Sequence, residues 1–194
     1  MKRTVIKENK MGAKEVSFVE KSREVHGEWK DEIFIKPEGV ECKHPDHEEC
    51  WHKNLVVISG TELLAGLMKN EVSFTGGILY HAIGIGEAAW DTVLVQPSFS
   101  DRFLVSELYR QIPDDIYYLD ALGDPTATIT NRIEAKTTYD YDCPANGNFI
   151  REQGLSGGNA TGAVDTGLFF DIIHHKSVYK DSSVKIVRYI RLTF

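Results

Sequence analysis

The chain has 194 residues, 42% hydrophobic and 26% charged, which is typical of a globular protein with one sizeable core. Its net charge of −7 argues against non-specific binding to nucleic acid or to an anionic membrane surface, because both require clustered Lys and Arg. No apolar run approaches the roughly 20 residues of a membrane helix, and no signal peptide is visible, so we expect a soluble protein made in the cytoplasm.

Residues 1–14 are polar and lack periodicity, which predicts a flexible N-terminal arm. Residues 15–194 are expected to form a single β-rich domain. Its first strands are predicted at residues 15–20 and 26–36. In the second of these, Trp29 and two isoleucines alternate with charged neighbours, the pattern of a half-buried strand.

A loop rich in His and Cys follows at residues 40–53. Five possible metal ligands fall within eleven residues: Cys42, His44, His47, Cys50 and His52. Such a set could hold Zn²⁺ in a tetrahedral structural site, within one chain or shared between subunits. Two alternatives stay open: a solvated acidic turn in which these residues are incidental, or a Cys42–Cys50 disulfide formed outside the cell.

A short helix is predicted at about residues 59–69. Ser59 and Glu62 have the spacing of a capping box at its start. One face of this helix is apolar and should pack on a larger element. That face contains Leu63, Leu64, Leu67 and Met68.

The remainder predicts strands separated by turns. A glycine-rich loop is expected at residues 154–167, and the adjacent His174 and His175 should point to opposite faces at a strand end. Residues 103–110 fit either a strand or a helix. Strands are predicted at residues 78–85, 116–122, 126–141, 168–174 and 184–194. The predicted fold is therefore mainly β: an antiparallel β-sandwich or small barrel with one short helix.

No motif indicates an enzyme. Gly84 and Gly86 lack the third glycine of a dinucleotide-binding fingerprint, and there is no nucleophile elbow, phosphate-binding loop or His-Glu-x-x-His motif. Five protein ligands at residues 42–52 would leave a metal no open position for a reacting water. A metal-dependent enzyme is the alternative, and we expect a non-enzymatic protein.

Several blocks between residue 54 and the C-terminus resemble, in order, virion structural proteins of tailed phages. They are Asn54–Val57, Gly60–Leu64, His81–Gly86 with Trp90 and Thr92, Leu104–Arg110, Asn148–Gly158, Gly167–Leu168 and Lys176–Leu192. The family reads Gly-Leu-Phe-Gly-Gly where this chain has Gly-Leu-Ser-Gly-Gly. Residues 1–53 have no counterpart in the resemblance.

The resemblance implies a structural subunit located in the virion, most readily in the tail, baseplate or collar. Such a protein would assemble with copies of itself, as a homo-oligomer, and with other virion proteins. From the acidic net charge we expect neither a nucleic-acid nor a membrane partner. The alternatives are a capsid decoration protein or a β-sandwich module that recognises a host glycan or receptor.

Overall fold

The computed structural model describes residues 3–8, 14–19, 25–35, 47–48 and 50–194. The fold is mainly β, as predicted, with antiparallel strands and a single α-helix in the described residues. That helix is α1 (Ile58–Lys69), and a short 3-10 turn, η1, spans Ala88–Asp91. No helix in these ranges is long and apolar enough to cross a membrane.

One small sheet is a hairpin of two strands, β1 (Arg3–Glu8) and β2 (Lys14–Val19). Part of the predicted N-terminal arm is thus a strand, and β2 matches the strand predicted at residues 15–20. The other twelve strands form one sheet. They are β3 (His26–Ile35), β4 (His47–Glu48), β5 (His52–Val56), β6 (Gly76–Gly84), β7 (Glu107–Gln111), β8 (Asp115–Leu119), β9 (Pro125–Thr126), β10 (Arg132–Tyr139), β11 (Asn148–Gly158), β12 (Leu168–Phe169), β13 (Asp171–Lys180) and β14 (Val184–Thr193).

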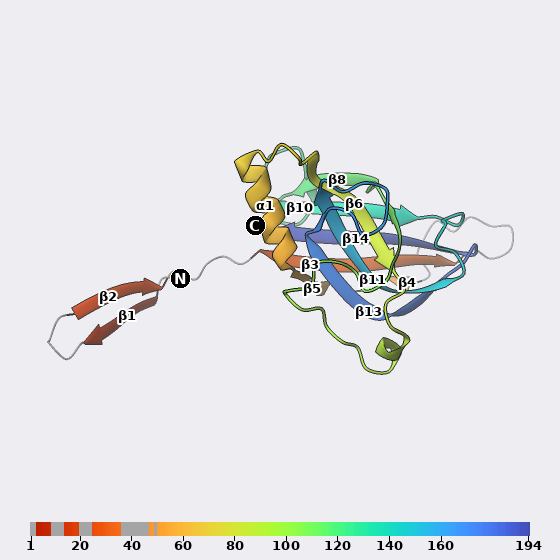
Figure 1. The fold of residues 1–194 in the computed structure, drawn as a ribbon, viewed down its shortest axis with the longest axis horizontal. Coiled ribbons are helices and arrows are strands. Elements are labelled where there is room, and N and C mark those ends of the chain that lie inside the picture. The colour runs from red at the N-terminus through yellow and green to blue at the C-terminus, as the bar shows by residue number, and fades with distance from the viewer. Residues whose placement is uncertain (1–2, 9–13, 20–24, 36–46, 49) are drawn as a thin grey trace.

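The order of the large sheet is β7-β6-β11-β13-β5-β3-β14-β10-β8-β9, with β12 added on β11 and β4 on β3. The short strand β5 joins two halves, because it pairs with β13 on one side and β3 on the other. The halves pack face to face (Figure 1): the main core cluster combines Trp29 and Ile190 from one half with Leu155 and Ile173 from the other. This arrangement is a β-sandwich closed along one side by β5.

The prediction of a loop over residues 154–167 is wrong for its first part. Residues 154–158 belong to β11, and only the segment after Gly158 is irregular. A Cβ on Gly154 would lie 2.4 Å from the carbonyl oxygen of Asp171, and one on Gly157 would lie 1.5 Å from that of Gly77. These glycines are therefore needed because neighbouring backbone approaches closely, not because the chain turns.

The helix lies where it was predicted, but its predicted capping box does not form. The N-cap residue is Val57, and no side chain caps the helix. Ser59 lies within the first turn and donates a hydrogen bond to the Phe169 carbonyl at 2.7 Å, while Glu62 pairs with Arg102. Leu63 is buried against the sandwich, whereas Met68, expected on the same face, is exposed.

Candidate functional site

The connection between β6 and β7, residues 85–106, is the longest segment of the sandwich without a strand, and it contains only η1. In Figure 1 it forms the green loop along the lower edge of the molecule, outside β13. Long connections of this kind in compact domains are commonly functional. Contacts along its whole length hold this one against the sandwich.

Glu152 on β11 holds both ends of the connection. Its buried carboxylate accepts hydrogen bonds from the backbone N–H of Gly86 at 3.2 Å, of Val105 at 2.8 Å and of Ser106 at 2.7 Å. Gly86 has a φ of +50° and is covered by the Trp90 ring, so a side chain would be strained and obstructed there. The two ends of the loop are thus closed by one side chain.

The η1 turn is held by β11 and β13. Trp90 is buried and stacks on the His174 ring, with centroids 4.0 Å apart. Asp91 pairs with Arg151 at 2.8 Å and accepts the Ser177 backbone N–H at 3.0 Å. The hydrogen bond from the Arg151 guanidinium holds the pKa of Asp91 well below its usual range, so this carboxylate stays ionised.

The middle of the connection is held by β13 and by the helix α1. His174 donates from Nδ1 to the Val95 carbonyl at 2.8 Å, and the N–H of Ile58, at the start of α1, donates to the Phe99 carbonyl at 2.8 Å. Arg102 makes a bidentate pair with Glu62, with both distances 2.7 Å.

Between these anchors the connection presents apolar side chains to solvent. Five of them have exposed fractions between 48% and 68%: Val93, Val95, Phe99, Phe103 and Val105. We call this set the apolar loop surface. A groove of about 860 Å³ includes Phe99, and a smaller hollow of about 450 Å³ lies beside Phe103, Val105 and Asp165. Ordered, exposed apolar side chains next to concave surface are typical of a protein interaction site.

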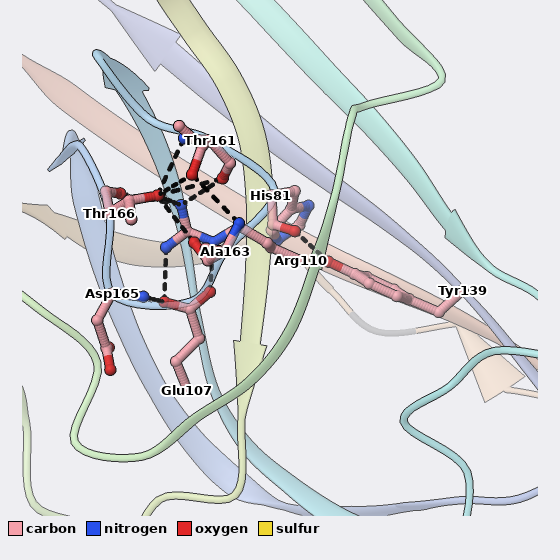
Figure 2. A network of polar contacts seen from close by, with 8 residues as sticks. All are labelled: His81, Glu107, Arg110, Tyr139, Thr161, Ala163, Asp165 and Thr166. Carbon is pink, nitrogen blue, oxygen red and sulfur yellow. Dashed lines mark hydrogen bonds and ion pairs between the residues drawn. The ribbon is translucent and has the colours of Figure 1, made fainter.

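A second loop, residues 159–167, borders the smaller hollow and is fixed by a buried ion pair. Figure 2 shows Arg110 between Glu107 on one side and Thr161 and Thr166 on the other. Arg110 donates to both Glu107 carboxylate oxygens, at 2.5 and 2.6 Å, and to the carbonyls of Thr161 and Thr166 at 3.2 and 2.9 Å. Glu107 also accepts the N–H of Asp165 at 2.9 Å. The rim of the hollow is therefore held in place from within.

Glu152→Gln should loosen the connection without unfolding the protein. The NH2 group of glutamine cannot accept the Val105 N–H, and the hydrogen bonds from Gly86 and Ser106 are then made to a neutral oxygen instead of a carboxylate. Together these changes should lower the free energy needed to open the loop by about 2 kcal/mol. Hydrogen exchange of the Gly86, Val105 and Ser106 amides should accelerate about 30-fold, as measured by NMR. Glu71→Gln, which removes an exposed pair with Lys69, should leave these rates unchanged. Unchanged exchange in Glu152→Gln would show that the carboxylate does not close the loop.

Polar side chains also fill part of the sandwich interior. His81 donates from Nε2 to Gln153 Oε1 at 3.0 Å and accepts the Thr137 hydroxyl at Nδ1 at 2.9 Å, and the Tyr139 hydroxyl donates to the His81 carbonyl. Figure 2 shows this last contact. Burial, aided by the nearby charge of Arg188, lowers the pKa of His81 to about 3. This imidazole is neutral and enclosed, which suits a structural role.

The sandwich interior also contains a buried ion pair between Arg188 and Asp31. Arg188 on β14 donates to Asp31 on β3 at 3.0 Å and to Nε2 of His175 at 3.0 Å. His175 in turn donates from Nδ1 to the Lys176 carbonyl at 2.7 Å. Burial, then the charge of Arg188, holds the pKa of His175 well below its usual range. His174 and His175 point to opposite faces, as predicted, but they lie within β13 and not at a strand end.

The predicted metal ligands lie partly outside the described residues, which do not include Cys42 and His44. His47 begins β4, Cys50 is exposed, and His52 begins β5 with its ring 5.2 Å from that of Trp29. Within the described ranges no group of three or more His, Cys, Asp or Glu could hold a metal ion. A structural zinc ion bound by this loop therefore stays a prediction.

Sequence reasoning missed the anchors of the connection. Glu152 and Arg151 lie inside a stretch that was noted only for its resemblance, and no local pattern marks a carboxylate that binds backbone N–H groups two strands away. No family model matches this chain, and comparison with curated proteins and with solved structures finds no match.

Proposed function

We propose that this chain is a non-enzymatic structural subunit of a tailed-phage particle, which assembles with copies of itself and with neighbouring virion proteins. The observation that carries the assembly role is the apolar loop surface, which Glu152, Asp91, His174 and α1 hold against the sandwich. Placement in the tail, baseplate or collar rests on the sequence resemblance.

Two physical arguments favour assembly through this surface. Exposed apolar side chains grouped on one connection gain free energy when a partner removes them from water. Because the connection is already ordered by its anchors, little conformational entropy remains to be lost on association. The hollow beside Phe103 and Val105 can accept an anchoring side chain of the partner.

The resemblance and the loop anchors also fall on the same segments. The block at residues 81–86 ends at Gly86, the block at 104–110 contains Val105 and Ser106, and the block at 148–158 contains Arg151 and Glu152. Trp90, which stacks on His174, also belongs to the residues that carry the resemblance. The blocks on which the proposed resemblance rests thus include the residues that hold the apolar loop surface in place.

The double variant Val93→Asp/Val95→Asp should dissociate the assembled species. Both side chains are more than half exposed, so the fold is retained, but two carboxylates would be buried at the interface. The dissociation constant should rise at least about 30-fold, equivalent to about 2 kcal/mol, as measured by light scattering coupled to size-exclusion chromatography.

The matched control is Val72→Asp/Leu122→Asp, which places the same charges at two highly exposed apolar positions away from the connection. This control should keep the mass of the wild-type assembly. If wild-type protein is a monomer that binds no virion component, the proposed function is wrong. If both double variants dissociate equally, assembly does not use the apolar loop surface.

A further inference from the structure

We propose that the hollow beside Phe103 and Val105 binds a Lys or Arg side chain of a basic neighbouring protein, with the Asp165 carboxylate as the counter-ion. This inference rests on the proposed function and names the chemistry of the partner at that site. Three features of the hollow carry it: the carboxylate of Asp165, the apolar walls beside this carboxylate, and the buried ion pair that holds the loop of Asp165 in place.

Asp165 is held by its backbone, which leaves its side chain available. Its N–H donates to Glu107 at 2.9 Å, and its φ of +56° lies in the left-handed region, which Asp and Asn adopt more readily than most residues. Its carboxylate makes no hydrogen bond or ion pair with any residue that the structure describes. In Figure 2 this carboxyl group points away from the Arg110 guanidinium. Asp165 is exposed and lines the hollow, so it offers a negative charge there.

The other charges beside the hollow are already matched. Glu107 also lines it, but Glu107 and Arg110 form an ion pair whose side chains have no exposed surface. All three guanidinium nitrogens of Arg110 donate hydrogen bonds, to Glu107 and to the carbonyls of Thr161 and Thr166. Among the described residues no Lys, Arg or His lines the hollow. The charge that it presents to a ligand is therefore that of Asp165, which selects a cation.

The walls of the hollow suit an aliphatic chain that ends in a positive charge. Phe103 and Val105 are 48% and 56% exposed, and Val164, next to Asp165, is 44% exposed. Lys and Arg pack their methylene groups along apolar surface while the charged end stays with water or a counter-ion. A cation over the Phe103 ring would gain a further attraction. A purely apolar side chain could use the walls, but it would bury the Asp165 carboxylate without a counter-ion.

Both sides of the hollow are held in position without a partner. Glu152 accepts the backbone N–H of Val105 on one side, and the pair of Glu107 and Arg110 fixes the loop of Asp165 on the other. Burying an ion pair costs free energy of desolvation, and here the pair orders the loop that carries the exposed carboxylate. Because both walls are ordered, a bound side chain would lose little binding free energy to the ordering of the hollow.

The charge of the chain favours a different protein over a second copy at this hollow. The chain has a net charge of −7, and residues 85–106 contain three carboxylates and one arginine. A second copy would bring like charge to an acidic surface, whereas a basic neighbour would be attracted and oriented by it. Contacts between copies would then use Val93, Val95 and Phe99, which do not line the hollow.

The test titrates the full-length, isotope-labelled chain with two peptides, acetyl-Leu-Arg-Leu-amide and its uncharged analogue with citrulline in place of arginine. NMR should show shifts of the Val105 methyl groups and the Asp165 N–H, with the arginine peptide binding about fivefold more tightly. Asp165→Asn, which tolerates the same backbone conformation, should make the two peptides bind equally. The control Asp124→Asn removes an exposed carboxylate between β8 and β9 and should keep the preference.

Equal binding of the two peptides to the wild-type chain, or a preference that survives Asp165→Asn, would overturn the inference. A preference present in the dissociated Val93→Asp/Val95→Asp chain but absent from wild type would also overturn it, because a second copy would then cover the hollow. If that double variant dissociates the assembly and no preference is found, the inference is wrong and the proposed function stands. If the preference is found but the double variant leaves the assembly intact, the cation site stands and assembly between copies does not use the apolar loop surface.

Discussion

Replacing Arg188 with methionine is expected to lower the free energy of unfolding by about 3 to 5 kcal/mol, as measured by urea denaturation. Arg188 and Asp31 are both about 1% exposed, and the guanidinium donates to the Asp31 carboxylate and to His175. Methionine fills a similar volume but leaves a carboxylate in the sandwich interior without its cation. The cost is mainly that of the uncompensated charge.

The exposed pair of Arg102 and Glu62 supplies the control. Its geometry is as favourable as that of the interior pair, with two contacts of 2.7 Å, but both side chains are more than 40% exposed. Arg102→Met should therefore cost no more than about 1 kcal/mol. Adding Asp31→Leu to Arg188→Met should recover part of the loss, because no buried charge then remains. Equal costs for Arg188→Met and Arg102→Met would contradict this account of the interior pair.

The strands that follow simple alternation could be predicted from the sequence. β3 and β14 were recognised because apolar side chains recur at every second position, and α1 was recognised from its apolar face. The same reasoning missed Asp31 and Arg188, each a charge on an otherwise apolar face. The register explains them: the two residues are direct partners across β3 and β14, and register is not visible in a single strand.

The glycines of β11 show a second limit of sequence reasoning. A cluster of Gly and Ser is typical of a loop, but at residues 154–158 it permits close approach of β6, β12 and β13. The local composition is the same in both cases, and only the neighbouring strands decide between them. The apolar loop surface was missed for a related reason. Its anchors come from β11, β13 and α1, all distant in sequence from residues 85–106.

Asp171 and the interior histidines should have opposite effects on how the free energy of unfolding depends on pH. Burial raises the pKa of Asp171 to about 7, although the carboxylate accepts the Leu155 N–H at 2.8 Å and an amide hydrogen of Asn54. From about pH 4 to 7 the folded state thus holds a proton that the unfolded state has lost. His81 and His175 are neutral when folded, so below about pH 6.5 the unfolded state gains two protons.

Between about pH 4.5 and 6.5 these three groups together leave the unfolded state with one more bound proton than the folded state. They therefore make the free energy of unfolding increase by about 1.4 kcal/mol for each unit by which the pH rises. Asp171→Asn keeps an acceptor for Leu155 but removes the opposing proton. Its free energy of unfolding, from urea titrations at several pH values, should therefore rise more steeply than that of wild type by about 1.4 kcal/mol per pH unit. His81→Gln should be shallower than wild type by a similar amount. Identical slopes for Asp171→Asn and wild type would mean that Asp171 is ionised in the folded state, with Asn54 and Leu155 compensating for its burial.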